Sequence, residues 1–149
     1  MMSDASIRKM TISKIYPSFI GESRVEAVTV HNRTLFLTLA ICYSGRLDIV
    51  SAVKELSRQV GTGILRPEDI TEDMISAHLS LNHLSHHSQY PDIIIRTSGE
   101  RRLSNFLLWE SAYSELYFTD VLWPDFNDKT LEDALLDYSK RSRRYGIRH

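Results

Sequence analysis

The richest cluster of chemically useful side chains lies between Arg96 and Ser104, in the sequence RTSGERRLS. The segment carries three arginines, the hydroxyls of Thr97, Ser98 and Ser104, and a glycine at position 99. Arginine offers forked donors and a permanent charge that suit phosphate oxygens, and glycine allows a close backbone approach. These residue types together predict a site for a phosphate or a diphosphate. An ordinary polar loop with surface arginines explains the same residues equally well.

Glu115 is the second candidate, because it lies in the aromatic and apolar stretch AYSELYF. Burying a carboxylate there is costly unless the group is paired or bound to a metal ion. Mg²⁺ accepts one or two carboxylates together with water and phosphate oxygens, so Glu115 is a candidate magnesium ligand. The alternative is a strand residue whose side chain faces solvent.

The remaining reactive residue types suggest no further site. Four histidines lie between positions 78 and 87, but their spacing fits no standard zinc pair, and a polar loop before Pro91 is favoured. Cys42, the one cysteine, excludes an internal disulfide and is expected to be a small buried residue. The aromatic side chains expected to pack in the core are Phe106, Trp109, Phe118 and Trp123.

Alternating strands and helices must position these residues. Apolar stretches rich in β-formers predict buried strands at 35–43, 92–96 and 116–118. Apolar residues at helical spacing and capping residues predict helices at 46–61, 71–79, 104–113 and 130–146. The order predicts an α/β fold with a mostly parallel central sheet flanked by helices. The arginine-rich segment then follows a strand end, where such sheets bind ligands, and amides at the start of the next helix would add donors.

Composition limits the class of protein. The chain has 149 residues, of which 42% are hydrophobic and 25% charged, as expected for a single globular domain over 1–149. Its 18 basic and 19 acidic residues leave a net charge of −1, which disfavours nucleic acid as a partner. The longest mostly apolar run, at 34–43, is too short for a transmembrane segment, and the start lacks the apolar stretch of a secretory signal.

Residues 91–126, PDIIIRTSGERRLSNFLLWESAYSELYFTDVLWPDF, resemble the C-terminal signature of the cis-prenyltransferases, the undecaprenyl and dehydrodolichyl diphosphate synthases. The block YSGRLDIVSAVKELSRQV at 43–60 is similar to the strand, loop and helix that precede it in the family. RSRRYG at 141–146 resembles the closing basic motif. The resemblance covers 34–146, implies the fold of that family, and leaves 1–30 as a divergent N-terminal segment.

The resemblance implies a prenyltransferase that condenses isopentenyl diphosphate in cis onto an allylic diphosphate such as farnesyl diphosphate, as in dolichol biosynthesis, with Mg²⁺ as cofactor. By position, Glu115 matches the family's Mg²⁺ ligand. Arg144 and Gly146 match the closing motif, which in the family reaches the substrate of the partner chain. The residues that the resemblance implies to bind substrate are Arg96, Arg102, Ser104, Arg144 and Gly146.

The chain departs from the family near its start. The family's phosphate-binding loop, with Asp-Gly-Asn-Gly-Arg or His-Gly-Asn-Arg, supplies a metal-binding aspartate and the arginines for the allylic diphosphate. No counterpart occurs here, so no catalytic residue is identified, and we expect an N-terminally truncated sheet and little or no activity from this chain alone. The alternative is a catalytically incomplete binding subunit that pairs with a full-length cis-prenyltransferase. Retention of Arg-Thr-Ser-Gly-Glu favours the enzyme.

The same resemblance sets the expected partners and location. We expect a homodimer, or a heterodimer with another cis-prenyltransferase chain, that binds isopentenyl and allylic diphosphates. Peripheral membrane association through the lipid product is compatible with this chemistry. The expected location is intracellular, either cytosolic or associated with the endoplasmic reticulum in a eukaryote, and a plastid address stays open.

Overall fold

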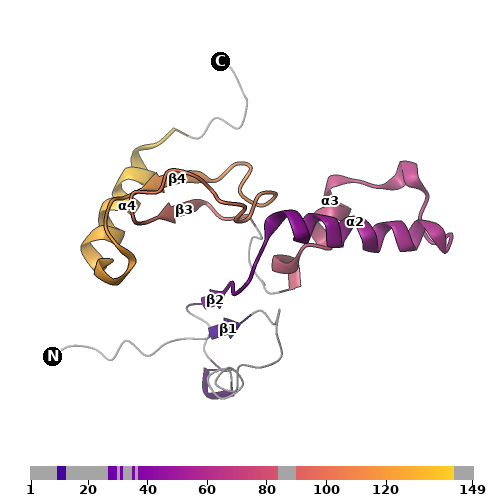
Figure 1. Cartoon of the computed structure of the whole chain (residues 1–149), viewed down its shortest axis with the longest axis horizontal. Coiled ribbons are helices and arrows are strands. Elements are labelled where there is room, and N and C mark those ends of the chain that lie inside the picture. Colours follow the sequence, from indigo (N-terminus) through magenta and orange to yellow (C-terminus); the bar gives the residue numbers. More distant parts are fainter. Residues whose placement is uncertain are drawn as a thin grey trace. The chain divides into compact units, whose positions relative to one another are not determined.

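The computed structural model describes residues 10–12, 27–29, 31, 35, 37–83 and 90–142 (Figure 1). The chain divides into two compact units, residues 1–86 and residues 87–149, and each is described by itself. The single domain predicted from chain length stays a prediction. Among the described helices, none combines the length and the apolar character that a membrane span requires.

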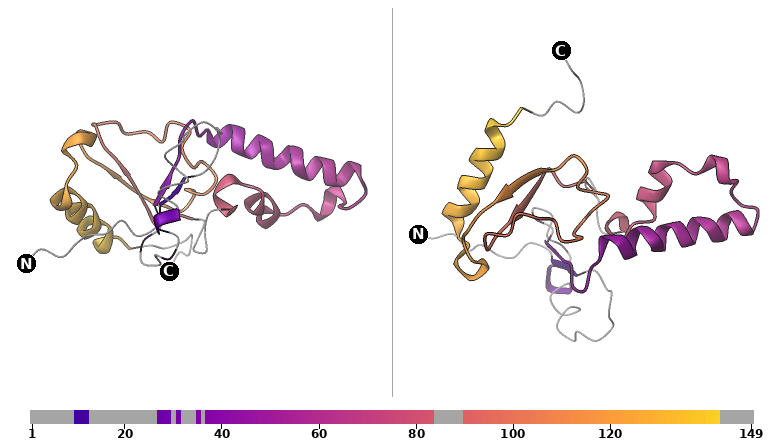
Figure 2. Two further views of the ribbon diagram at one scale, coloured as in Figure 1. Left: turned by 90° about the horizontal axis from the view of Figure 1, so that it is seen from below. Right: turned by 45° about the horizontal axis from the view of Figure 1, so that its top comes forward.

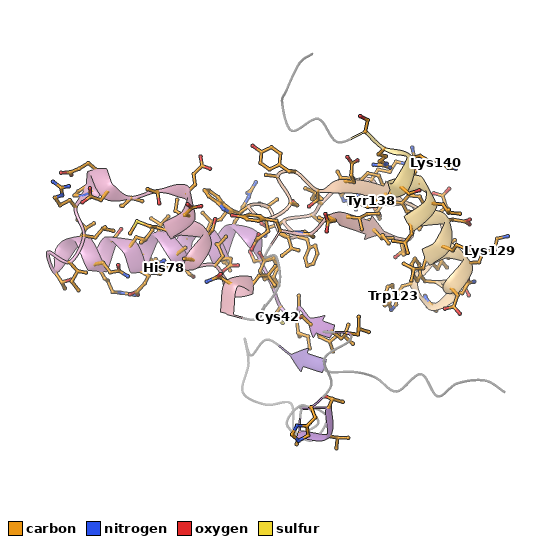
Figure 3. All side chains as sticks on the ribbon, turned by 180° about the vertical axis from the view of Figure 1, so that it is seen from behind. Cys42, His78, Trp123, Lys129, Tyr138 and Lys140 are labelled. Atoms are coloured by element: carbon orange, nitrogen blue, oxygen red, sulfur yellow. The ribbon has the colours of Figure 1, made fainter. Side chains whose placement is uncertain are left out.

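The first unit contains a short parallel strand pair. Strand β1 (Met10–Ile12), which the sequence did not predict, pairs with β2 (Leu37–Leu39) in the register Met10 to Leu37. The predicted strand at 35–43 is therefore shorter than expected, and it is not buried, because Leu37 is 40% exposed. Cys42 is also exposed, and its φ of 56° is incompatible with a continuing strand (Figure 3). The prediction of a buried Cys42 is wrong.

Two helices follow as the periodicity predicted (Figure 2). Helix α2 (Gly45–Gly61) begins after Ser44, whose side chain accepts a hydrogen bond from the backbone N–H of Leu47 at 3.4 Å. Helix α3 (Glu72–Ala77) begins after Thr71, which caps the N–H of Met74 in the same way at 3.3 Å. Between them lies the short 3₁₀-helix η1 (Pro67–Asp69). One face of α2 is buried, at Gly45, Asp48, Ala52 and Leu56.

Polar side chains hold the helices of this unit together. Asp48 is only 7% exposed, and its carboxylate accepts hydrogen bonds from the N–H of Ser80 at 3.1 Å and from its hydroxyl at 2.7 Å. Asp48 thus caps the 3₁₀-helix η2 (Ser80–His83) from a distant part of the chain. His78 Nδ1 lies 2.7 Å from the carbonyl of Met74, and its Nε2 lies 3.2 Å from the amide nitrogen of Gln59 (Figure 3).

The second unit is built on the two strands that carry the candidate site. Strands β3 (Ile93–Arg96) and β4 (Glu115–Phe118) pair in parallel, with Ile93 opposite Glu115 and Arg96 opposite Phe118. After β4 come the 3₁₀-helix η3 (Trp123–Asp125) and helix α4 (Asp128–Lys140), which lies beside β4 (Figures 1 and 2). The parallel strands and helices confirm the predicted α/β class.

Two predicted helices differ from the structure. Residues 104–113 form consecutive turns and no helix, because Ser104, Asn105 and Leu107 have positive φ values, which a right-handed helix excludes. The last helix begins at Asp128, where Asn127 accepts a hydrogen bond from the N–H of Thr130 at 3.1 Å, and it ends at Lys140. Thr130 is therefore inside the helix and not at its start.

Candidate functional site

The turn after β3 is the centre of the candidate site. Ser98 and Gly99 both adopt left-handed backbone conformations, with φ values of 69° and 71°. The N–H of Ser98 donates to the carbonyl of Val121 at 2.8 Å, and the N–H of Gly99 donates to the carbonyl of Thr119 at 3.0 Å. Both amides are thus engaged, and no helix begins at Ser104. The backbone donors predicted at a helix start are therefore absent there, and the anion site predicted at this turn would depend on side chains.

The absence of a side chain at position 99 still has a structural use. A Cβ atom there would lie 3.2 Å from Oδ1 of Asp120, tighter than an ordinary contact. The glycine therefore lets the turn approach the loop that follows β4, while its positive φ would strain any larger residue. The close approach predicted for Gly99 is to protein.

A cavity of about 310 Å³ opens beside this turn. Its lining residues are of two chemical kinds, and those with charged or hydroxyl side chains are Arg96, Thr97, Ser98 and Glu100. The apolar lining comes from Ile94, Ile95, Leu103, Phe106 and Phe118. Such a cavity suits a small ligand with an anionic head and a hydrocarbon tail. Phe106 and Phe118 were predicted to be core residues, and the structure places both in this wall.

Arg96 is the predicted site residue that the structure brings to the cavity. It ends β3, is half-buried and lines the cavity. Its guanidinium makes no ion pair with any acidic side chain in the described ranges 37–83 and 90–142. A partly desolvated guanidinium without a counter-charge is well suited to an incoming phosphate group.

Arg102 and Ser104 are placed differently. Arg102 is exposed and forms an ion pair with Glu100, so it is connected to the cavity through a residue that lines it. Ser104 is also exposed, has a φ of 48° and is absent from the cavity lining. The predicted substrate residues Arg144 and Gly146 lie outside the described residues.

Glu115 lies at the other end of the strand pair from Arg96. It begins β4 opposite Ile93, so three strand positions, roughly 10 Å, separate it from the register position of Arg96. Oε2 of Glu115 accepts a hydrogen bond from Arg141 Nη1 at 2.8 Å, and Arg141 Nε donates to Asp137 at 2.8 Å. Hydrogen bonds to Glu115 and then to Asp137 raise the pKa of Arg141 above its ordinary value.

This arrangement does not fit a magnesium ion bound between Glu115 and a diphosphate in the cavity of the same chain. The carboxylate is already paired with a cation, and the cavity is at the opposite strand end. Among the described residues, no group of three or more acidic, histidine or cysteine side chains gathers as a metal site. The predicted ligand role of Glu115 stays a prediction.

The apolar surface beyond β4 also departs from the sequence prediction. Trp123 is 72% exposed and stacks on Phe126 with ring centroids 5.9 Å apart, so it is not a core residue (Figure 3). Near the start of the strands, Tyr138 of α4 donates to Asp92 Oδ1 at 3.3 Å. Together with the Arg141–Glu115 ion pair, this hydrogen bond places the C-terminal part of α4 at the strand end occupied by Glu115.

The sequence matches known proteins over most of its length. Residues 13–146 match the protein family described as "Putative undecaprenyl diphosphate synthase". An isoprenyl transferase of Streptococcus thermophilus is 56% identical over 118 residues, which are 79% of this chain and 47% of that protein. A ditrans,polycis-undecaprenyl-diphosphate synthase of Xylella fastidiosa, specific for (2E,6E)-farnesyl diphosphate, is 48% identical over 125 residues, covering 84% of this chain and 48% of that protein.

Solved structures agree with the sequence comparison. Lavandulyl diphosphate synthase from Lavandula x intermedia, in complex with dimethylallyl diphosphate, superimposes with a TM-score of 0.84 at 37% identity, covering 93% of this chain and 60% of that one. A probable undecaprenyl diphosphate synthase from Campylobacter jejuni gives a TM-score of 0.71 at 26% identity, with coverages of 93% and 63%. The chain spans about half the length of the curated relatives it matches.

Proposed function

Because the chain belongs to the undecaprenyl diphosphate synthase family of prenyltransferases, we propose that it takes part in the cis condensation of isopentenyl diphosphate with an allylic diphosphate. The cavity at the end of β3 is the proposed binding site for isopentenyl diphosphate. Arg96 binds the diphosphate, with Thr97 and Ser98 as additional hydroxyl donors. Phe106 and Phe118 contact the five-carbon chain.

The observation that supports this proposal most strongly is that a charged residue and several apolar residues line the same cavity. Arg96 offers a charge without an acidic partner among the described residues, and the apolar residues of the same cavity offer a surface for hydrocarbon. Inorganic diphosphate would use only the arginine charge, and a neutral isoprenoid alcohol would use only the apolar residues. A ligand with both parts gains from both, because charge-assisted hydrogen bonds and apolar burial are separate contributions.

Within the condensation, these residues bind and orient the substrate. In isopentenyl diphosphate the reacting double bond lies at the end of the hydrocarbon chain remote from the diphosphate. A diphosphate held at Arg96 and a tail held between apolar side chains fix the direction of that double bond, which lowers the entropic barrier to attack on the allylic carbon. Mg²⁺ remains the cofactor that the family resemblance implies, and no step of this proposal passes through it.

The other expectations for the reaction remain predictions. A second prenyltransferase chain, in a homodimer or a heterodimer, is the predicted partner, and Arg144 and Gly146 are the residues predicted to reach its substrate. The dimethylallyl diphosphate in the lavandulyl diphosphate synthase complex supports the class of ligand, because it is a five-carbon prenyl diphosphate. Farnesyl diphosphate is the proposed allylic substrate, in keeping with the specificity of the Xylella relative.

Isothermal titration of the full chain tests the proposed cavity with three ligands: isopentenyl diphosphate, inorganic diphosphate and isopentenol. Arg96→Gln removes the charge and is expected to weaken both diphosphate ligands about tenfold or more. Phe118→Ala is expected to weaken isopentenyl diphosphate but not inorganic diphosphate, because it removes only apolar contact. Lys129→Gln is the charge-matched control, since Lys129 is exposed on α4 and absent from the cavity lining (Figure 3).

The outcomes separate the possible failures. No binding of either diphosphate by the unmodified chain contradicts the proposed function. Binding that Arg96→Gln leaves unchanged places the site elsewhere. The Glu115→Gln variant, titrated with isopentenyl diphosphate in the presence of Mg²⁺, tests Glu115 as the predicted metal ligand. A large loss of affinity for isopentenyl diphosphate would contradict the separation of Glu115 from the cavity.

A further inference from the structure

The loop that follows β4 holds the cavity turn at three backbone positions. The N–H of Thr119 donates to the carbonyl of Arg96 at 3.0 Å, and the carbonyl of Thr119 accepts from the N–H of Gly99 at 3.0 Å. The carbonyl of Val121 accepts from the N–H of Ser98 at 2.8 Å. The loop thus bonds the backbone of the arginine that binds the proposed ligand and both left-handed residues of the turn.

The side chain of Thr119 shapes this loop. Its Oγ1 accepts a hydrogen bond from the N–H of Val121 at 3.3 Å, two residues further along. A threonine hydroxyl bonded to the second following amide bends the backbone locally in place of a backbone turn. In the loop bent in this way, the carbonyl of Val121 accepts the hydrogen bond from the N–H of Ser98.

The turn needs such support because its conformation is unfavourable by itself. Ser98 has a φ of 69°, and a non-glycine residue in this region is disfavoured by roughly 1–2 kcal/mol. Strained residues of this kind persist only where their surroundings hold them, and they gather at ligand sites. Without the loop, Ser98 would relax toward an ordinary conformation and move away from its place in the cavity lining.

We propose that Thr119 is a positioning residue for the diphosphate site: its hydroxyl holds the loop that fixes the Arg96–Gly99 turn. Thr119 does not line the cavity, so it acts through the turn and not by touching the ligand. The inference rests on the proposed function of the cavity and adds a residue to it. It also explains why a turn with both of its amides engaged by protein belongs to an anion site, since those bonds set the directions of its side chains.

The test compares two substitutions at position 119 in the full chain. Thr119→Val keeps the shape but removes the hydroxyl, and the affinities for isopentenyl diphosphate and inorganic diphosphate are expected to fall together, roughly threefold to tenfold. Thr119→Ser keeps the hydroxyl and is expected to restore most of the affinity. Thr130→Val is the matched control, because its hydroxyl donates to Asn127, the capping residue before α4, and not to the turn. Thermal unfolding of each variant confirms that it is folded at the titration temperature.

A double-mutant cycle with Arg96→Gln distinguishes positioning from general loosening. If Thr119 acts through the turn, Thr119→Val costs less affinity once the arginine charge is gone, because only the hydroxyls of Thr97 and Ser98 remain to be misplaced. Equal losses in both backgrounds, or a Thr119→Ser variant as weak as Thr119→Val, would overturn the proposal. Unchanged affinity in Thr119→Val overturns it too while leaving the proposed function intact, whereas an unmodified chain that binds neither diphosphate refutes the proposed function itself.

Discussion

The buried carboxylate of Asp48 provides the sharpest test of the first unit. Asp48→Ala removes the acceptor for two donors of Ser80, the backbone N–H at 3.1 Å and the hydroxyl at 2.7 Å. Hydrogen bonds to a charged acceptor contribute about 1.5–3 kcal/mol each when buried, and less when solvent can replace them. Because this contact is part-buried, we expect the free energy of unfolding to fall by about 2–4 kcal/mol.

A second substitution divides that loss between the two donors. Ser80→Ala removes the hydroxyl but keeps the backbone N–H, and it is expected to cost about 1 kcal/mol. In the Asp48→Ala background the same change is expected to cost almost nothing, because the hydroxyl has already lost its acceptor. The difference between the two backgrounds measures the interaction of the carboxylate with the hydroxyl.

Urea unfolding followed by the helical circular dichroism signal is the appropriate measurement, because Asp48 lies on α2, the longest of the helices that the structure describes. Both tryptophans, Trp109 and Trp123, belong to the second unit, so their fluorescence follows that unit separately. Asp73→Ala is the control, an exposed acid in the first turn of α3, with an expected cost below about 1 kcal/mol. Additive losses from Asp48→Ala and Ser80→Ala would refute the capping role.

Four further predictions concern three other residues of the chain: Arg141, Gly99 and Cys42. Arg141→Gln breaks the ion pair with Glu115 and is expected to lower the free energy of unfolding in urea by about 1 kcal/mol. The affinity for isopentenyl diphosphate is expected to stay unchanged. A loss of that affinity would contradict the separation of Glu115 from the cavity. Since the pKa of Arg141 is raised, the charge of Arg141 stabilises the folded chain at neutral pH, and this stabilisation is lost only as pH rises through that pKa. The contribution of the Arg141–Glu115 pair to the free energy of unfolding is therefore expected to stay constant between pH values of roughly 7 and 10. Gly99→Ala is expected to cost about 1–2 kcal/mol, because its φ of 71° strains a Cβ that would also meet Asp120, and an unchanged melting temperature would contradict that conformation. Cys42 is expected to react rapidly with a thiol reagent in the folded chain, whereas protection until unfolding would favour the buried strand first predicted.

The elements with simple periodicity could be predicted from sequence. The spacing of Ala52 and Leu56, with a serine cap before Gly45, is sufficient to place α2, because amphipathic spacing and capping act locally. The isoleucines of β3 likewise predicted a strand, and Arg96 ends that strand as expected and lines the cavity, while its role in anion binding stays a prediction. These signals depend on neighbouring residues alone.

The rest depended on contacts distant in sequence. Nothing in the types of Ser104 and Leu107 predicts positive φ, so a helix was expected where turns occur. The engagement of the Ser98 amide depends on Val121, more than twenty residues away, so the residues near Ser98 do not indicate it. The position of Glu115 relative to the cavity follows from strand register, which depends on pairing between residues more than twenty positions apart. Apolar spacing around Phe118 was the signal that could have found the cavity wall.

The volume of the cavity has a consequence for how a polymer is made. About 310 Å³ is at the small end for ligand pockets, enough for a prenyl unit with its diphosphate but far too little for a chain of many units. As the proposed isopentenyl diphosphate site, a cavity of this volume would hold one monomer and not the growing product. In that role it would have to empty and refill at every addition, so its affinity for the monomer would have to be moderate enough for rapid exchange.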